Sequence, residues 1–322
     1  MNITRRGLMA GAGALGLLPV AARAQAAWPN RPVRFIVPFA AGGPVEVPAR
    51  FIADALGPKL GHPVVVEPKP GAGGSLGVQA VVQANDPHTL LVTTSSVAIL
   101  PALMANPGYD PFRDLVPITM VSEAPMVLLA KPDNPIKDLA DLIARAKARP
   151  GAITYGTSGV GSTTHLGGAL LGVRAGIELL HVPYRGAGQA VTALYAGDTD
   201  LLVTGTIEAL RHVREGRLKA IAVTGAARTP VMPDTPAIGE AVPGYAMTIW
   251  YAMFGPASTP PEVVQRLAAA VAPLARGNAL ATRMEESGAT LLLDGPDRLR
   301  TRLAAEVPQW KELVSRAGIR AG

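Results

Sequence analysis

The sequence predicts an α/β protein with two lobes, each built on a parallel sheet covered by helices. Short apolar runs alternate with stretches in which apolar residues recur at helical spacing, and this alternation occurs in two successive blocks. The first block starts with the β-branched run from Val33 to Val37, and the second follows Leu128. The chain has 322 residues and no cysteine, so we expect two cores stabilised by burial rather than by disulfides.

The elements of both blocks follow from local pattern. In the first block, helices are expected from Val47 and from Leu76, each after a glycine-rich turn. In the second block, a helix is expected from Ile136 to Arg149, where Pro150 and Gly151 stop it. The expected strands are short and apolar: 33–37, 64–66, 89–92, 153–155, 201–203 and 219–223.

A long apolar run from Thr248 to Pro256 is expected to cross from one lobe to the other. A capping box should open the next helix, with Thr259 as N-cap, Pro260 at the first position and Glu262 at the third. The C-terminal helices are then expected to return to the first lobe. The predicted boundaries are 28–127 plus 248–322 for the first lobe and 128–247 for the second, joined by a two-strand hinge.

Residues 1–24 have the pattern of an export signal. Paired Arg5 and Arg6 precede an apolar stretch that ends at Val20, and a small-residue cleavage site ends at Ala24. The arginine pair indicates the twin-arginine route, with the ordinary secretory route as the alternative. We therefore expect a periplasmic protein whose signal peptide is cleaved near Ala24.

Charge and motif patterns exclude several classes of function. Cleavage near Ala24 removes three arginines and no acid, so the excess of basic residues falls from six to three. Without a block of Lys and Arg, nucleic acid is not an expected partner. The five histidines lack metal-ligand spacing, and no P-loop or complete dinucleotide fingerprint is present, so we expect neither a metal nor a cofactor.

Two glycine-rich turns, Ala40 to Glu46 and Gly156 to Thr163, each lie between a strand-like run and a helix-like pattern. Such a turn presents unpaired backbone N–H groups at the positive end of a helix dipole, so it can bind a carboxylate or phosphate without a catalytic side chain. The alternative is that the glycines only let the chain bend sharply. Two such turns in one chain suggest a clamp around an anion.

A hydrolase is the alternative that the residues themselves offer. Ser158 or Ser162 could be the nucleophile, with His165 one helical turn after Ser162, but no acid is evident to orient the imidazole. A nucleophile elbow requires glycine where Val160 stands. We therefore predict no catalytic residue, expect His165 to cap or brace its turn, and expect Glu46 to orient ligand or stabilise its helix.

The most specific pattern is a series of segments taken in order: Trp28 to Val33, Val37 to Gly43, Val66 to Gly74, Tyr155 to Ser162, His181 to Gly186 and Pro233 to Pro236. With these segments the chain resembles, from Trp28 to about Ile319, the Bug family of extracytoplasmic substrate-binding proteins of tripartite tricarboxylate transporters. The resemblance implies a type II periplasmic binding protein, a Venus flytrap that closes on a small carboxylate and delivers it to membrane permease subunits. We expect a monomer, and docking on a receptor kinase is the alternative partner.

The resemblance also implies that main-chain and hydroxyl donors from both turns hold the carboxylate of the ligand. Mapped onto this sequence, the ligand-binding residues of the first lobe are Phe39, Ala40, Gly42, Gly43, Pro44, Glu46, Ser95 and Ser96. Those of the second lobe are Ser158, Gly159, Gly161, Ser162, Thr163, Tyr184, Gly186, Ala187, Thr204, Gly205 and Thr206.

Two departures from the family pattern bear on the ligand. The usual Gly-Gly-x-x-Asp is replaced by Gly42 to Glu46, in which Pro44 removes one amide donor. Where relatives often carry an acidic or amide side chain, this chain has Thr204 to Thr206 and so lacks a counter-charge for an amine. We therefore expect a plain mono- or dicarboxylate, aromatic ones included, rather than an amino acid.

Overall fold

The structure is a computed structural model that describes residues 28–39, 41 and 45–319. The expected export signal lies outside the described residues. So do four predicted site residues of the first glycine-rich turn: Ala40, Gly42, Gly43 and Pro44. Among the helices that the structure describes, none is long and apolar enough to cross a membrane.

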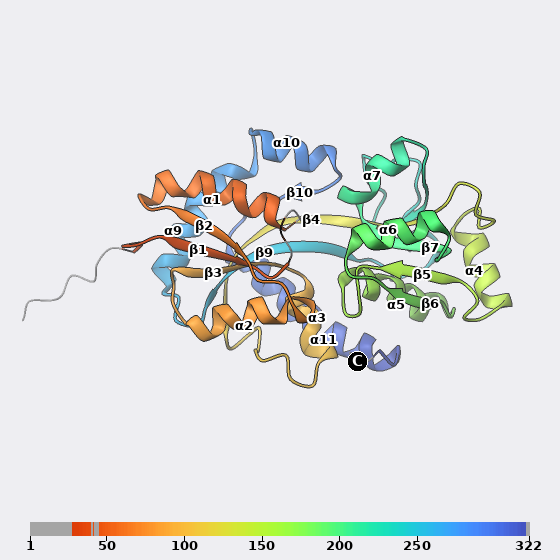
Figure 1. Cartoon of the computed structure of the whole chain (residues 1–322), viewed down its shortest axis with the longest axis horizontal. Coiled ribbons are helices and arrows are strands. Elements are labelled where there is room, and N and C mark those ends of the chain that lie inside the picture. Colours follow the sequence, from red (N-terminus) through yellow and green to blue (C-terminus); the bar gives the residue numbers. More distant parts are fainter. Residues whose placement is uncertain (1–27, 40, 42–44, 320–322) are drawn as a thin grey trace, which may run out of the picture.

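Strands and helices alternate along the described chain (Figure 1). The strands are β1 (Val33–Val37), β2 (Val64–Pro68), β3 (Thr89–Thr94), β4 (Leu115–Ala130), β5 (Thr154–Thr157), β6 (Leu180–Pro183), β7 (Leu201–Gly205), β8 (Lys219–Val223), β9 (Thr248–Pro256) and β10 (Thr290–Leu291). The helices are α1 (Glu46–Leu60), α2 (Ser75–Ala84), α3 (Ser96–Leu103), α4 (Leu139–Ala148), α5 (Thr163–Ala175), α6 (Ala187–Ala196), α7 (Thr206–Arg214), α8 (Ile238–Ala241), α9 (Pro261–Val271), α10 (Ala279–Glu286) and α11 (Pro296–Arg316). Two short 3₁₀ helices cover Ala72–Gly74 and Ala272–Ala275.

The strands form a mixed sheet in the order β2-β1-β3-β9-β4-β7-β5-β6, to which β8 and β10 add by pairing with β4. The strands β1, β2 and β3 pair in parallel, as do β5, β6 and β7. Between these two parallel sets, β4 and β9 pair antiparallel with each other. Figure 1 shows both strands running through the middle of the molecule from one set to the other. The fold is therefore the expected two-lobed α/β arrangement with two crossing strands.

The strand β4 is longer than the sequence analysis predicted. An apolar run was expected to begin near Leu128, but the strand begins at Leu115 and has 16 residues. Its first part contains Pro117 and Pro125, and proline argues against a central strand. Register shifts after Pro117 and after Met120 accommodate this irregular stretch against β9.

The helices α9 and α4 begin later than the sequence predicts, because their N-cap residues lie further along the chain than expected. The predicted capping box at Thr259 is wrong, because α9 has Pro260 as its N-cap and begins at Pro261. A residue that precedes a proline is pushed toward extended backbone, and Pro260 has φ −67° and ψ 149°. In α4, Asp138 accepts a hydrogen bond from the Asp141 backbone N–H at 2.8 Å, so this helix begins later than predicted.

Buried apolar side chains form a core on each side of the sheet. One cluster lies under α1, α9 and α10, and includes Phe35, Ile52 and Tyr251. The largest cluster joins α2, α3 and α11 to α4 and α5, so it extends across the crossing strands. A third cluster lies under α6 and α7. The helices after β9 thus pack on elements from the start of the chain, and α11 contacts both α3 and α5.

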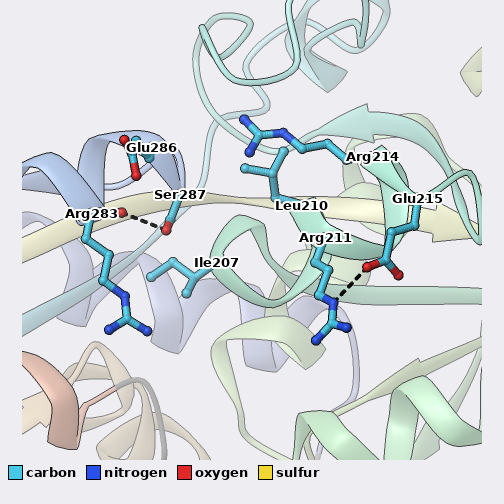
Figure 2. Close-up of a pocket in the computed structure, with 8 residues that line it drawn as sticks. All are labelled: Ile207, Leu210, Arg211, Arg214, Glu215, Arg283, Glu286 and Ser287. Carbon is cyan, nitrogen blue, oxygen red and sulfur yellow. Dashed lines mark hydrogen bonds and ion pairs between the residues drawn. The ribbon is translucent and has the colours of Figure 1, made fainter.

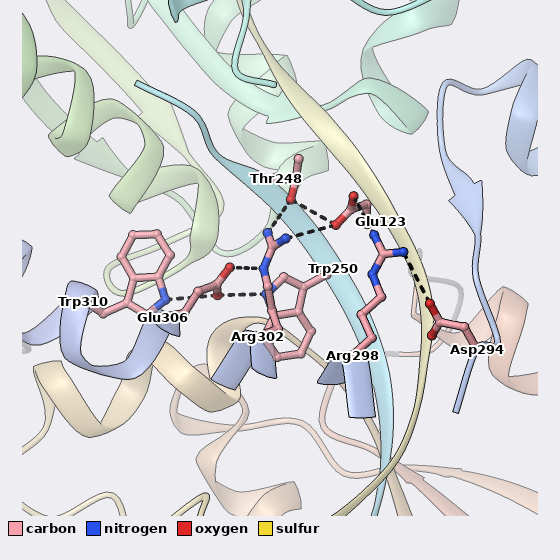
Figure 3. A network of polar contacts seen from close by, with 8 residues as sticks. All are labelled: Glu123, Thr248, Trp250, Asp294, Arg298, Arg302, Glu306 and Trp310. Carbon is pink, nitrogen blue, oxygen red and sulfur yellow. Dashed lines mark hydrogen bonds and ion pairs between the residues drawn. The ribbon is translucent and has the colours of Figure 1, made fainter. Parts of the chain in front are cut away.

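A buried carboxylate fastens α11 to the crossing strands (Figure 3). Glu306 is 7% exposed and accepts hydrogen bonds from the indole N–H groups of Trp250 at 2.9 Å and Trp310 at 3.3 Å. It also forms an ion pair with Arg302, one turn earlier on the same helix. The charge of Glu306 is therefore compensated and hydrogen-bonded, as a buried charge requires.

Arg302 extends this network to both crossing strands. Its guanidinium donates to Thr248 Oγ1 on β9 at 2.7 Å and lies 3.3 Å from Glu123 Oε2 on β4. Arg298 adds a second ion pair to Glu123, at 3.5 Å (Figure 3). The network is thus centred where β9 begins and β4 changes partner from β9 to β7 and β8.

Replacing Glu306 by alanine is expected to destabilise the protein by about 3 kcal/mol, because two indoles and a guanidinium lose their acceptor in a buried site. The measurement is the free energy of urea unfolding. The control is Glu312→Ala on the same helix, whose ion pair with Arg316 is exposed and should contribute less than about 1 kcal/mol. Equal losses in the two variants would contradict the assigned role of Glu306.

Candidate functional site

The predicted site residues that the structure describes gather at the carboxyl ends of parallel strands, where α/β proteins bind their ligands. Because β5, β6 and β7 are neighbours in the sheet, the residues that follow them are neighbours too. The strand ends and their residues are β1 with Phe39, β3 with Ser95 and Ser96, β5 with Ser158 to Thr163, β6 with Tyr184, and β7 with Thr204 to Thr206.

Loops from the two parallel sets touch. The hydroxyls of Ser95, after β3, and Thr163, after β5, are 2.7 Å apart, and both residues are buried. Nearby, a Cβ added to Gly161 would lie 2.7 Å from Leu103 Cδ1 on α3. The sequence analysis assigned Ser95 and Thr163 to opposite sides of one site, and the structure brings these two residues together.

The second glycine-rich turn is organised by hydroxyl groups. Thr164 Oγ1 lies 3.0 Å from Ser158 Oγ and 2.9 Å from Ser162 Oγ, and accepts a hydrogen bond from the Ser158 N–H at 3.2 Å. Ser162 is the N-cap of α5, accepting from the His165 N–H and donating to the Gly159 carbonyl. Thr164 was missed by the sequence analysis, because its role depends on where the turn folds back.

His165 braces this turn, as expected. Its ring Nδ1 accepts the Gly161 N–H at 3.2 Å, and its ring stacks on that of His181 with centroids 3.7 Å apart. His181 Nε2 in turn lies 2.6 Å from Thr157 Oγ1. Burial lowers the pKa of His165 to about 4, and burial together with the neighbouring His165 lowers the pKa of His181 to about 3. Both rings are therefore uncharged near neutral pH.

The two serines proposed for the hydrolase alternative have other partners. Ser158 and Ser162 both contact Thr164, and Ser162 donates to a carbonyl. Within the described part of the chain, neither hydroxyl is hydrogen-bonded to an imidazole, and the His165 ring is turned toward Gly161 and His181. The geometry thus offers no nucleophile and base in contact.

Of the described residues of the first turn, Val45 and Glu46 are buried and Ala41 is exposed. Glu46 is the first residue of α1, is 4% exposed and forms an ion pair with Arg50 one turn later. An acid in this position is favoured by the helix dipole. Phe39 is half-buried, and Ser96 accepts a hydrogen bond from the Thr94 hydroxyl at 2.9 Å.

The loop after β6 presents the start of α6. Gly186 is the N-cap of this helix with φ +111°, a backbone conformation that favours glycine, and Ala187 is its first residue. Tyr184 is half-buried, and burial, followed by the charge of Asp198, raises the pKa of its hydroxyl. These residues lie beside the second turn, because the Tyr184 N–H donates to the Thr157 carbonyl at 3.1 Å.

The loop after β7 holds polar groups without partners. Thr204 and Thr206 are 1% and 0% exposed, and neither hydroxyl has a hydrogen-bond partner among the described residues. Gly205 between them is the N-cap of α7. The sequence analysis missed Glu208, two residues further on, because an acid in the first turn of a helix is ordinary. Burial raises the pKa of its carboxyl.

A cavity of about 400 Å³ lies between α7 and α10, and Ile207 in its lining directly follows Thr206 of the loop after β7 (Figure 2). Its rim is charged, with Arg211 paired to Glu215 at 2.9 Å. No predicted site residue lines it; the lining residues are Ile207, Leu210, Arg211, Arg214, Glu215, Arg283, Glu286 and Ser287. In the described ranges, no group of three His, Asp or Glu residues is placed to hold a metal.

Known proteins share both the sequence pattern and the fold. The family model described as "Tripartite tricarboxylate transporter family receptor" matches residues 48–319. The solved structure of the periplasmic binding protein BugD is 35% identical, with a TM-score of 0.81 over 91% of this chain and 99% of that one.

Two further solved structures are described with ligands. R. palustris Rpa4515 with adipate is 31% identical, with a TM-score of 0.82 over 91% of this chain and 99% of that one. MatC (Rpa3494) from Rhodopseudomonas palustris with bound malate is 32% identical, with a TM-score of 0.80 over 89% of this chain and 99% of that one.

Gly161→Ala tests the contact between the loops, and Gly176→Ala is its matched control. Both glycines belong to the ends of α5 and have positive φ, +76° and +61°, so alanine costs each about 1–2 kcal/mol. Only at Gly161 would the new methyl meet Leu103; at Gly176 nothing lies within 4 Å. Ligand affinity, measured by calorimetry, should fall at least fivefold in Gly161→Ala alone. Equal affinities would contradict the contact.

Because His165 and His181 stay uncharged in the folded protein, we expect its free energy of unfolding to fall in mild acid. The folded pKa values are depressed below 6.5, so between pH 6.5 and 5 the unfolded chain takes up protons that the folded protein refuses. Each histidine should cost about 1.4 kcal/mol per pH unit once the unfolded chain is protonated. His181→Gln removes one titrating ring, so its unfolding free energy should change less over this range. Identical slopes for wild type and variant would rule this out.

Proposed function

Because the chain belongs to the tripartite tricarboxylate transporter receptor family, we propose that it is a periplasmic solute-binding protein for a small mono- or dicarboxylate. It would act after cleavage near Ala24, as a monomer that hands its ligand to the permease subunits of a tripartite transporter. The observation that carries this proposal is the contact of the Ser95 and Thr163 hydroxyls, which follow strands of the two different parallel sets. Adipate and malate in two similar structures support the ligand class.

The proposed lobes are residues 28–127 plus 248–322 and residues 128–247, with the hinge where β4 and β9 cross. A carboxylate held between loops of both lobes would make more contacts when the lobes are together, and would therefore shift the hinge equilibrium toward closure. Charge-assisted hydrogen bonds contribute about 1.5–3 kcal/mol each, so several of them reach the ~8 kcal/mol of micromolar affinity. No covalent step is needed.

The proposed ligand contacts are the residues predicted from the sequence, including the backbone of the first turn from Ala40 to Pro44. Support comes from the strand ends at which the described members gather and from their donor chemistry. The side chains from Thr204 to Thr206 are uncharged, which favours a plain carboxylate over an amino acid.

A thermal-shift screen of the mature protein tests the function, because a ligand that binds only the folded state raises its melting temperature. The panel contains adipate, malate, benzoate, aspartate and glutamate. At least one plain carboxylate should raise the melting temperature, and mass analysis should recover it unchanged. The proposal fails if no acid binds, if the acid is converted, or if aspartate or glutamate binds more tightly than every plain carboxylate.

Ser158→Ala should weaken binding of the best acid about fivefold to tenfold, because one hydroxyl donor is lost from the second turn. The melting temperature of the ligand-free protein should hardly change, since Ser158 is half-buried on a loop. Arg283→Ala, on the rim of the α7–α10 cavity, is the control and should keep its affinity. A loss of stability in Ser158→Ala as large as the loss of binding would assign this serine to packing.

A further inference from the structure

Glu208 forms no ion pair with any residue that the structure describes. It lies on the first turn of α7 and is half-buried. The nearest arginine along its own helix, Arg211, is paired with Glu215. Burial raises the pKa of the Glu208 carboxyl, and the only opposing cause is its own backbone N–H. The ionised form is therefore poorly compensated where it stands.

The carboxyl of Glu208 is placed against the loop after β7. A Cβ added to Gly205 would lie 2.6 Å from Glu208 Oε2, so the carboxyl covers a position that only glycine leaves open. On either side of Gly205, the hydroxyls of Thr204 and Thr206 are buried and have no partner among the described residues. Buried polar groups are normally satisfied, so these two neighbouring hydroxyls indicate a missing partner.

This cluster faces the other lobe. Ile207, next to Glu208, packs against the core cluster under α1, α9 and α10. Thr206 Oγ1 is 3.4 Å from the position of a Cβ at Gly288, beyond α10. Burial, followed by the charge of Glu208, raises the pKa of the Tyr251 hydroxyl on the crossing strand β9. A ligand that reaches this cluster would therefore lie between the two proposed lobes.

The charge of the neighbours decides what that partner is. Tyr251 from β9 is uncharged at neutral pH, and so are the loop residues Thr204 to Thr206. Arg211 on α7 and Glu215, directly after this helix, neutralise each other. A carboxylate ligand in the crevice would add negative charge and disfavour ionised Glu208 further. A protonated carboxyl, in contrast, donates a hydrogen bond.

We propose that Glu208 binds the ligand in its protonated form and donates its O–H to an oxygen at the end of the ligand remote from the glycine-rich turns. Glu208 then selects acids with oxygen acceptors at both ends, dicarboxylates first, over acids whose far end is an ammonium. This inference rests on the proposed function. When the ligand binds at a pH above the pKa of free Glu208, one proton passes from solvent to a carboxylate oxygen of Glu208. No other bond forms or breaks.

Calorimetry of the mature protein tests the inference, with adipate or malate, whichever binds more tightly, as the probe. Titrations run from pH 5.5 to 8.5 in buffers of different ionisation enthalpy, which reveals proton uptake. The expected result is uptake that approaches one proton per ligand as pH rises, with affinity highest at low pH and falling by up to tenfold per pH unit.

Glu208→Gln keeps an N–H donor and cannot titrate, so its affinity should be within threefold of wild type at pH 5.5 and independent of pH. Glu208→Ala should bind at least tenfold more weakly. Glu286→Gln, an exposed acid on α10, is the control and should keep the wild-type profile. Melting temperatures without ligand confirm that each variant is folded.

Four outcomes would overturn the inference. Binding in Glu208→Ala equal to wild type would show that the carboxyl does not touch the ligand. Affinity that rises with pH, together with a large loss in Glu208→Gln, would make Glu208 the counter-ion of a cationic group. If neither acid binds wild type but another plain carboxylate of the panel does, dicarboxylate selection is wrong while the proposed function stands. Failure of every acid would reject both.

Discussion

The antiparallel pairing of β4 and β9 is the constraint on which the rest of the structure depends. These two strands pair from Leu115 with Pro256 to Pro125 with Thr248, and then β4 continues alone to β7 and β8. In the strand order, β9 and β4 lie between the two parallel sets and join them into one sheet. In the proposed function, a change of angle where β4 leaves β9 would move one proposed lobe against the other.

The two sides of the proposed hinge differ in the charge of their side chains. On the α11 side, Arg302 and Glu306 form a compensated network with two tryptophans and Thr248, which fixes α11 to the start of β9. On the side of the strand ends, the groups are hydroxyls, backbone N–H groups, two uncharged histidines and the half-buried carboxyl of Glu208. An anion that enters there meets donors rather than fixed cations, so hydrogen-bond geometry rather than net charge would set selectivity.

Much of the fold could be predicted because the spacing of apolar residues and the glycine-rich turns are visible in the local sequence. The strand Thr248–Pro256 was predicted with the bounds that the structure has. Leu115 to Met126 was missed because its prolines obscure the strand pattern, and Thr259 was misassigned because two prolines follow it.

Site residues could likewise be predicted where a local motif marks them, but not where only tertiary contacts define them. The residues after β3 and β5 were identified by motif, and Ser95 and Thr163 do meet. Glu208 carries no motif: its carboxyl becomes unusual only where it is packed against Gly205 without a cation. His181 likewise acquires its role from the distant Thr157 and His165, and Thr164 acquires its role because its own turn folds back on Ser158.

The most direct test of the central claim is a crystal structure of the mature protein with its best-binding carboxylic acid. The account predicts carboxylate oxygens about 3 Å from donors of both loops, those after β1 or β3 and those after β5 or β7. An acid bound only to one lobe, or in the α7–α10 cavity with the loops empty, would contradict it.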